Sequence, residues 1–283
     1  MPVFCLTKLK TGLPYFCLMK PRLLLPAALL VLFFMGCNDG DNGNDPDPGA
    51  PAIPLISYSI TGTTPHDTSY FTEGLEFHNG QMLESTGHYG KSRLARYDAA
   101  TGKLVQEISL DDRFFGEGLT VFRDTLYQLT WKENVVLVYT VNDFKKIMEL
   151  PLRGDGWGLT HDSTNLIASN GSSDLFFYEP GTFKLLNTLT VRENGSFVPN
   201  INELEYVNGA VYANQWNSDY IFRIDPVTGE VTGKMDLGSI HQREKAMNPA
   251  ANEMNGIAYN PDTKLFHITG KNWSQTYLLQ MPH

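Results

Sequence analysis

The sequence predicts an all-β fold, a five-bladed β-propeller closed by an N-terminal strand, and two observations lead to it. From residue 55 onward, apolar residues alternate over short runs such as "TLYQLTW", "VVLVYTV" and "YIFRID", which is typical of half-buried strands. Turn sequences such as "HNGQ" and "DPVTGE" separate these runs, and helical periodicity is scarce. The second observation is that the runs recur in five similar units.

Each unit opens on a short motif and continues with further strands. The motifs are "EGL" at Glu73–Leu75 and Glu117–Leu119, "WGL" at Trp157–Leu159, "NEL" at Asn202–Leu204 and "NGI" at Asn255–Ile257. Their central positions lie 40 to 53 residues apart. Four-stranded repeats of this length are typical of propeller blades. A β-sandwich or an irregular barrel is the rival fold, but neither explains five similar openings.

The fifth unit ends one strand short, because the chain stops soon after "TYLLQM". The extended segment "LISYSIT" (Leu55–Thr61) precedes the first unit and is predicted to supply the missing outer strand. Pairing the two ends would remove two exposed sheet edges. We expect His66, in the "PHD" sequence before the first unit, to hold this closing strand rather than to take part in chemistry.

Residues 1–36 differ from the rest of the chain. They carry four basic residues and no acidic one, and the uncharged run Leu23–Gly36 precedes Cys37. A basic start followed by a short apolar run is typical of a secretory signal, and "FFMGC" resembles a bacterial lipobox, whose cysteine is lipidated. We therefore predict a lipoprotein-type signal peptide over 1–36, with an ordinary signal peptide or a short anchor as the alternative. Translation starts at Met1 or at Met19.

Residues 37–54, rich in Asn, Asp, Gly and Pro, are predicted to form a flexible tether before a propeller domain over 55–283. Cys37 is the only cysteine after the leader, so the domain depends on its core rather than on disulfides. Loss of the four leader cations leaves 18 basic against 31 acidic residues, a net charge of −13. This excludes nucleic acid and anionic lipid as expected partners.

These observations predict an exported protein of the bacterial cell envelope, in the periplasm or at the cell surface. We expect it to meet the membrane only through a lipid anchor at Cys37, and to be a monomer. The histidines show no paired metal-ligand spacing, and neither a phosphate loop nor a nucleophile elbow is found in the sequence. The sequence therefore predicts neither a metal nor another cofactor.

Two sets of residues are expected at one mouth of the central channel, because inner strands begin where the antiparallel second strands end. The openings supply Glu73, Glu117, Trp157, Asn202 and Asn255, and the second-strand ends supply Gly87, Trp131, Gly171, Trp216 and Lys271. Packing between blades is the alternative role for any one of them. Three of the chain's four tryptophans at equivalent positions nevertheless favour a binding site with a few convergent polar groups.

The motifs "PHDTSYFTEGLEF", "FFGEGLT", "LTWKE", "GWGLT", "NELEYVNGAVYANQW" and "MNGIAYN" resemble those of the plant-type glutaminyl cyclases, in family order over residues 65–273. The resemblance implies a five-bladed propeller that converts the N-terminal glutamine of peptides or proteins to pyroglutamate, releases ammonia and uses no metal. It implies that Glu117 is the catalytic acid/base. The family's pocket positions fall on Phe71, Phe115, Trp131, Trp157, Asn202, Trp216 and Lys271.

Glu73 departs from the plant pattern, where this position is glutamine, whereas bacterial members often have glutamate. We expect Glu73 and Asn255 to bind substrate as well. Three alternatives remain at this stage. They are a carbohydrate-active enzyme using the two carboxylates, a metal-dependent lactonase-like propeller with Glu117, Asn202 and Asn255 as ligands, and a non-catalytic peptide-binding propeller.

Overall fold

The computed structural model describes residues 52–281 of the 283-residue chain. The predicted signal peptide (1–36), Cys37 and most of the predicted tether (37–54) lie outside the described residues. Within the described range, no helix combines the length and the apolar character needed to cross a membrane.

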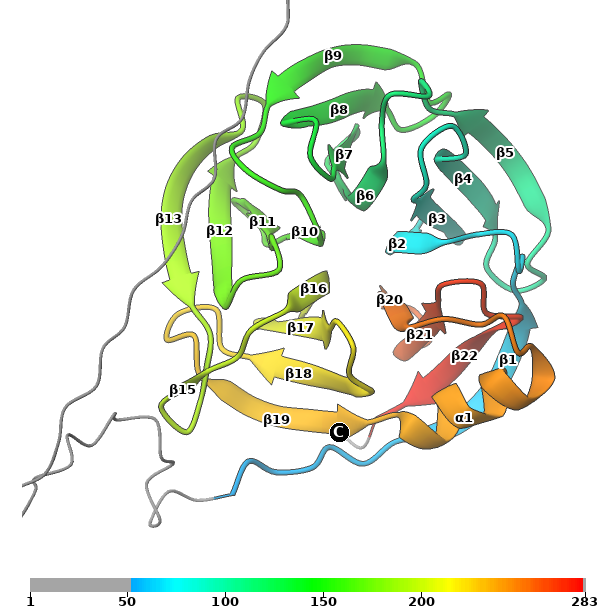
Figure 1. Cartoon of the computed structure of the whole chain (residues 1–283), viewed down its shortest axis with the longest axis vertical. Helices are drawn as coiled ribbons and strands as arrows, with labels where there is room; N and C mark the ends of the chain where they lie inside the picture. Colours follow the sequence, from blue (N-terminus) through cyan, green and yellow to red (C-terminus); the bar gives the residue numbers. More distant parts are fainter. Residues whose placement is uncertain (1–51, 282–283) are drawn as a thin grey trace, which may run out of the picture. The chain divides into compact units, whose positions relative to one another are not determined.

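Five four-stranded antiparallel sheets are arranged around a central channel, and their innermost strands line it (Figure 1). In the first four blades the strands are arranged in chain order, from the innermost strand at the channel to the outermost. In the fifth blade the three inner strands follow the same order, but the outermost strand comes from the N-terminal side of the domain. The prediction of a five-bladed β-propeller is confirmed. The core lies between neighbouring blades, where apolar faces of adjacent sheets meet in a series of buried clusters.

The first blade comprises β2 (Thr72–His78), β3 (Gln81–Thr86), β4 (Arg93–Asp98) and β5 (Leu104–Ser109). The second comprises β6 (Gly116–Phe122), β7 (Thr125–Thr130), β8 (Val135–Thr140) and β9 (Lys146–Pro151). The third comprises β10 (Leu159–His161), β11 (Leu166–Ala168), β12 (Asp174–Glu179) and β13 (Lys184–Thr190). The fourth comprises β16 (Ile201–Val207), β17 (Ala210–Gln215), β18 (Tyr220–Ile224) and β19 (Val231–Asp236). The fifth comprises β20 (Met254–Asn260), β21 (Leu265–Gly270), β22 (Gln275–Gln280) and β1 (Ser59–Pro65), and β14 (Arg192–Glu193) with β15 (Ser196–Phe197) forms a small hairpin before the fourth.

Strand β1 pairs with β22 in antiparallel register, from Ser59 opposite Gln280 to Pro65 opposite Gln275. The strand therefore lies about four residues further along the chain than the predicted segment 55–61. The difference arises because Leu55 instead makes a parallel bridge to Lys234 of the fourth blade.

His66 follows β1 directly and is buried. One ring nitrogen, Nδ1, lies 2.8 Å from the carbonyl oxygen of Trp273, and the other, Nε2, lies 3.0 Å from Glu84 Oε1. Its backbone N–H donates to the carbonyl of Ser274 at 3.0 Å. The imidazole thus joins the end of β1 to the first and fifth blades, the structural role expected for it.

A helix, α1 (Gly238–Met247), was not expected from the sequence. It connects the fourth blade to the fifth and lies beside β22 and β1 (Figure 1). Only Ile240 and Glu244 of this helix are buried, so it lacks the wide apolar stripe by which helices are found in sequences. Glu244 accepts hydrogen bonds from the Tyr277 hydroxyl at 2.8 Å and from the Ser274 N–H at 2.8 Å, which fix the helix to the fifth blade.

The inner strands of neighbouring blades touch backbone to backbone at the glycines of the opening motifs. The Gly118 N–H donates to the Trp157 carbonyl at 2.7 Å. A Cβ atom at Gly118 would lie 2.4 Å from the Leu159 nitrogen, and one at Gly158 would lie 2.1 Å from the Asn202 carbonyl oxygen. Side chains are therefore sterically excluded here, and the glycines serve the approach of the next blade.

The fourth blade has Glu203 where the first three have glycine, and this side chain is fully buried. Its two carboxylate oxygens accept the Leu75 N–H at 3.2 Å and the Ile257 N–H at 2.8 Å. Leu75 and Ile257 belong to the inner strands of the first and fifth blades. One carboxylate thus ties three blades together across the channel and satisfies two buried backbone donors.

Two further carboxylates act in the same way toward the other mouth of the channel. Glu76 accepts the Val121 N–H of the second blade at 2.9 Å, and Glu205 accepts the Tyr259 N–H of the fifth blade at 2.9 Å. Burial raises the pKa of Glu76 to about 8, and it raises the pKa of Glu205 well above the usual range, to which the charge of Glu76 also contributes.

Replacement of Gly118 by alanine should lower the free energy of unfolding by about 1–3 kcal/mol, because the methyl group collides with backbone that cannot rotate away. The matched control is Gly62→Ala in β1, where a Cβ would meet only the Leu278 side chain at 3.5 Å. We expect the control to change stability by less than about 0.5 kcal/mol. Urea denaturation measures both, and equal stability of the two variants would contradict the steric argument.

The channel carboxylates should make the protein less stable as the pH rises from 6.5 to 8. The pKa of Glu76 is raised on folding, so folding takes up a proton, and stability falls until the pH passes about 8. Each such proton corresponds to a slope of about 1.4 kcal/mol per pH unit. Burial lowers the pKa values of four histidines, and these groups stabilise the fold as the pH rises only below about 6.5, the pKa of an unfolded histidine. From pH 6.5 to 8 they therefore do not offset the loss of stability. They are His78, His88, His161 and His267.

Glu76→Gln keeps a carbonyl oxygen for the Val121 N–H but cannot ionise, and should therefore flatten the decline. The control is Glu179→Gln, which removes an exposed carboxylate at the end of β12. Denaturation midpoints measured at several pH values test this, and a stability that stays constant from pH 6.5 to 8 in the unmodified protein would refute it.

Candidate active site

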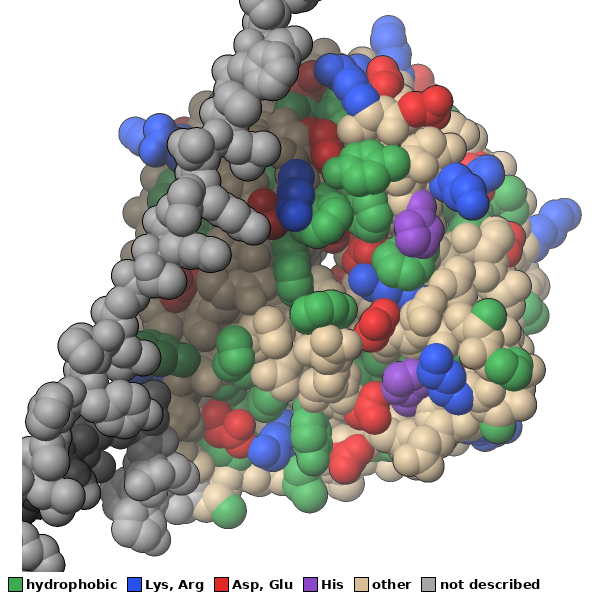
Figure 2. Space-filling model, in the orientation of Figure 1, with side chains coloured by type: hydrophobic (Ala, Val, Ile, Leu, Met, Phe, Trp, Pro, Cys, Tyr) green, Lys and Arg blue, Asp and Glu red, His purple; other side chains and the backbone are tan. Residues whose placement is uncertain are grey.

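A cavity of about 360 Å³ opens at one mouth of the channel. Figure 2 shows this face of the propeller, with hydrophobic side chains gathered around the hollow at its centre. The volume suits a small ligand or one end of a larger one. The lining residues are Phe71, Glu73, His88, Phe115, Glu117, Trp131, Trp157, Asn202, Trp216, Glu253 and Lys271.

The predicted site residues come together here with the exception of Asn255. Glu73 lies on β2, Glu117 on β6 and Asn202 on β16, each near the start of an inner strand. Trp131, Trp216 and Lys271 follow directly after the second strands β7, β17 and β21. The two sets share one mouth because inner and second strands run in opposite directions.

Glu73 forms an ion pair with Lys271, whose Nζ lies 2.9 Å from Glu73 Oε1. Lys271 Nζ also lies 4.4 Å from the centre of the Phe71 ring, in a cation–π contact. Asn255, predicted to bind substrate, is fully buried behind the wall. Its Nδ2 donates to Glu73 Oε2 at 3.1 Å and to the Thr72 carbonyl at 3.0 Å, so it holds Glu73 in place instead of lining the cavity.

Glu117 has a different environment. Only 5 % of its surface is exposed, and within residues 52–281 neither a cation nor a hydrogen-bond donor pairs with its carboxyl group. Burial raises the pKa of Glu117 well above its usual range, and the negative charge of Glu73 raises it further. Burial also raises the pKa of Glu73, but Lys271 opposes this and leaves it at about 7. Two carboxyl groups on adjacent inner strands thus differ in proton affinity.

Aromatic rings form the walls. The Phe115 ring lies edge-on to Phe71, with 6.4 Å between centroids, and 5.4 Å from the centroid of Trp131. Trp157 and Trp216 meet edge to face at 6.0 Å. These contacts hold large rings in defined orientations around the two carboxyl groups.

The two glycines of the predicted second set do not line the cavity. A Cβ at Gly87 would lie 2.3 Å from the Phe115 ring, and one at Gly171 would lie 2.5 Å from the Trp157 ring. Both positions therefore make room for the aromatic walls, an indirect contribution to the site.

His88 and Glu253 also line the cavity and were missed from the sequence. The His88 ring lies 4.1 Å from the Phe71 ring. Glu253 stands two residues before Asn255, the same register that places Phe71 before Glu73 and Phe115 before Glu117. Extending that register to the fifth blade would have found Glu253. The sequence offers no comparable signal for His88, which follows Gly87 with a φ of 87°.

Two hydrogen-bond donors at the site have no partner within the part of the chain that the structure describes. Trp157 Nε1 is buried without an acceptor among the described residues. The Asn202 side chain lines the cavity and donates no hydrogen bond to the protein in that same part of the chain. Donors left free beside a carboxyl group of raised pKa can hold a polar oxygen while a proton moves.

The three ligands predicted for a metal-dependent lactonase do not line one cavity, because Glu117 and Asn202 line it whereas Asn255 does not and instead donates to Glu73. No cluster of three or more His, Cys, Asp or Glu side chains within residues 52–281 has an arrangement suited to a metal ion. The cavity is instead built from the Glu73–Lys271 ion pair, from the carboxyl groups of Glu117 and Glu253, which have no ion-pair partner among residues 52–281, and from free donors and aromatic walls.

The fold and site together define a propeller whose channel mouth combines aromatic walls with carboxyl groups, a lysine and a carboxamide. The family model described as glutamine cyclotransferase matches residues 29–281, and the chain belongs to this family. It is 36% identical to the glutaminyl-peptide cyclotransferase of Arabidopsis thaliana over 269 residues, which cover 94% of this chain and 83% of that protein. It also resembles the crystal structure of Myxococcus xanthus glutaminyl cyclase, with 35% identity, a TM-score of 0.75, and coverage of 81% of this chain and 98% of that one.

Proposed function

We propose that the chain is a glutaminyl-peptide cyclotransferase, which converts an N-terminal glutamine to pyroglutamate and releases ammonia. The relatives named above carry this activity in their names and match nearly the whole propeller. The observation that carries the proposal is the buried Glu117, a carboxyl group of raised pKa that lines the cavity without a partner among residues 52–281.

The reaction needs little beyond correct positioning and one proton carrier. The α-amine of the substrate attacks its own side-chain amide carbon, a nitrogen–carbon bond forms, and the bond to the amide nitrogen breaks. Because the ring has five members, the aromatic walls need only hold the bent conformer. Amide anion is a poor leaving group, so the departing nitrogen must receive a proton before ammonia leaves.

Glu117 is suited to carry that proton. Its raised pKa makes the carboxylate basic enough to accept a proton from the α-amine, whose reference pKa is near 8. The same group can then give the proton to the leaving nitrogen. Glu73 and Lys271 neutralise each other at 2.9 Å, so Glu73 serves to orient the amine and Lys271 rather than to carry the proton.

The oxygen of the reacting amide gains negative charge and needs donors. Lys271, one candidate, is engaged by Glu73, whereas Trp157 Nε1 donates to no described residue. The free indole N–H and the Asn202 carboxamide are therefore the preferred donors in this proposal.

Glu117→Gln should lower the rate of ammonia release from a Gln-initiated dipeptide by about two to four orders of magnitude, because the amide cannot shuttle the proton. Glu73→Gln makes the same atomic change on the neighbouring strand and should retain more activity. Circular dichroism checks that both variants fold. Near-normal turnover by Glu117→Gln would remove this residue from the mechanism.

The same assay separates the alternatives. A carbohydrate-active enzyme would release reducing sugar rather than ammonia, and a metal-dependent lactonase would lose its activity with a chelator and regain it with metal. A peptide-binding propeller would bind Gln-initiated peptides without ammonia release. We expect ammonia release that continues in the presence of a chelator.

We further propose that the enzyme is an exported, monomeric lipoprotein of the cell envelope, anchored through Cys37. The basic start, the apolar run and the lipobox-like "FFMGC" support this proposal. Labelled fatty acid should be incorporated into the unmodified chain expressed in a bacterium, and Cys37→Ala should abolish the label. Equal labelling of both chains would disprove anchoring at Cys37.

A further inference from the structure

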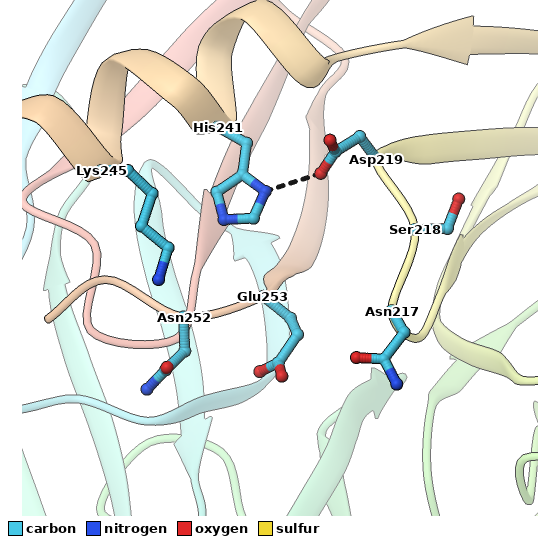
Figure 3. A pocket seen from close by; sticks show the side chains of 7 residues that line it. All are labelled: Asn217, Ser218, Asp219, His241, Lys245, Asn252 and Glu253. Carbon is cyan, nitrogen blue, oxygen red and sulfur yellow. Dashed lines mark hydrogen bonds and ion pairs between the residues drawn. The ribbon is translucent and has the colours of Figure 1, made fainter. Parts of the chain in front are cut away.

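Figure 3 shows a second cavity, of about 320 Å³. It shares Glu253 with the cavity at the channel mouth, which we call the aromatic cavity. Helix α1 contributes from one side and the loop between β17 and β18 from the other. The side chains that line it are polar or charged, in contrast to the aromatic walls next to it. They are Asn217, Ser218, Asp219, His241, Lys245, Asn252 and Glu253.

Hydrogen bonds hold the walls of this second cavity in place. His241 Nδ1 lies 2.6 Å from Asp219 Oδ1, and the Asp219 carbonyl accepts the Leu237 N–H at 2.9 Å, which together join α1 to the loop. The His241 ring stacks on Trp273, with 5.7 Å between centroids. The helix and the loop that form this cavity are therefore fixed to each other.

The two cavities also share backbone. The Asn252 N–H donates to the Lys271 carbonyl at 2.7 Å, and the Lys271 N–H donates to the Glu253 carbonyl at 2.9 Å. On the opposite side, Trp216 lines the aromatic cavity while the next residue, Asn217, lines the second one. A ligand that extends from the aromatic cavity past Glu253 thus enters the second cavity directly.

The second cavity offers unused binding groups. Glu253 is half-buried and forms no ion pair with any residue in the described range, and exposed Lys245 forms none either. The Asn217 carboxamide likewise has no hydrogen-bond partner in the described part of the chain. Two carboxylates, Asp219 and Glu253, face one lysine across the space. Asp219 Oδ1 is engaged by His241 Nδ1, which leaves Glu253 as the carboxylate without a partner among the described residues. Because Glu253 is half-buried whereas Lys245 is exposed, water screens the lysine more strongly, and a ligand cation is favoured over an anion here.

The proposed reaction requires such a site. Ring closure places the α-amine and the side-chain amide of the substrate in the aromatic cavity, whereas every later residue is attached through the α-carbonyl and must leave that cavity. Resting on the proposed function, we propose that the second cavity binds the residues that follow the N-terminal glutamine and favours a basic side chain over an acidic one. The carboxamides of Asn217 and Asn252 are placed to meet peptide groups of the same segment.

The test compares kcat/KM for ammonia release from glutaminyl-lysyl and glutaminyl-glutamyl peptides, each divided by the value for glutaminamide, which lacks a second residue. Glu253 is one of the charges that, after burial, raise the pKa of Glu73. Using the ratio between the two peptides cancels any effect on the shared chemistry. We expect the unmodified enzyme to prefer the lysyl peptide about two- to fivefold, the size of a half-exposed ion pair.

Two substitutions that remove charges of opposite sign sharpen the experiment. Glu253→Gln should lower the preference toward one, whereas Lys245→Gln should raise it by a similar factor of about two to five. Asp262→Asn is the control, because it removes one exposed charge from the β20–β21 turn, next to Pro261 at the other mouth of the channel. It should leave the preference unchanged.

The inference is supported if the preference for the lysyl peptide falls in Glu253→Gln, rises in Lys245→Gln and stays the same in Asp262→Asn. Turnover of both peptides with a preference that neither Glu253→Gln nor Lys245→Gln alters would overturn the inference while the proposed function stands. Failure of the unmodified enzyme to release ammonia from any glutaminyl substrate would overturn the proposed function and the inference together.

Discussion

The site depends on the backbone contact between inner strands at Gly118. Because no side chain separates blades two and three there, the Gly118 N–H reaches the Trp157 carbonyl at 2.7 Å. Gly74 makes a similar approach to Gly118 from the first blade. The residues that precede these glycines, Glu73 and Glu117, are consequently brought to adjacent places at the channel mouth. A steric condition on backbone packing thus brings the charge of Glu73 next to Glu117, which adds to burial in raising the pKa of Glu117.

The protein resolves this repulsion by giving the two carboxyl groups unequal partners. Lys271 and Asn255 both hold Glu73 in place, and Lys271 limits the rise that burial causes in its pKa, which is about 7. Glu117 has no ion pair or hydrogen bond from the described residues, and although the charge of Lys271 opposes the rise in its pKa, Glu117 keeps the higher proton affinity. The division of labour follows from neighbours on the fifth blade, since Lys271 and Asn255 both belong to it. Acid and base chemistry at one site commonly rests on such paired but unlike environments.

The sequence predicted the blade count and most of the cavity because both follow from the repeat. Residues at equivalent places in equivalent units must converge on the axis, which places Trp131 and Trp216 without any knowledge of side-chain geometry. The repeat places a residue at a blade opening but does not show which way its side chain points. It therefore could not show that the Asn255 side chain is buried against Glu73 instead of lining the cavity. Helix α1 was missed because it interrupts the repeat and buries only two side chains. The pairing of Leu55 with Lys234 instead of with the fifth blade was missed because it depends on a tertiary contact.

The longest spacing between openings, from the fourth unit to the fifth, contains α1, and this irregularity bears on specificity. The inner strands cannot vary freely, because Gly118 and Glu203 are fixed by backbone contacts and hydrogen bonds. The helix is not one of these inner strands, and the segment that follows it leads to Glu253, which lines the aromatic cavity. A propeller of this kind can therefore change what it accepts beyond the reacting residue by altering one inter-blade connection, while the geometry that moves the proton stays the same.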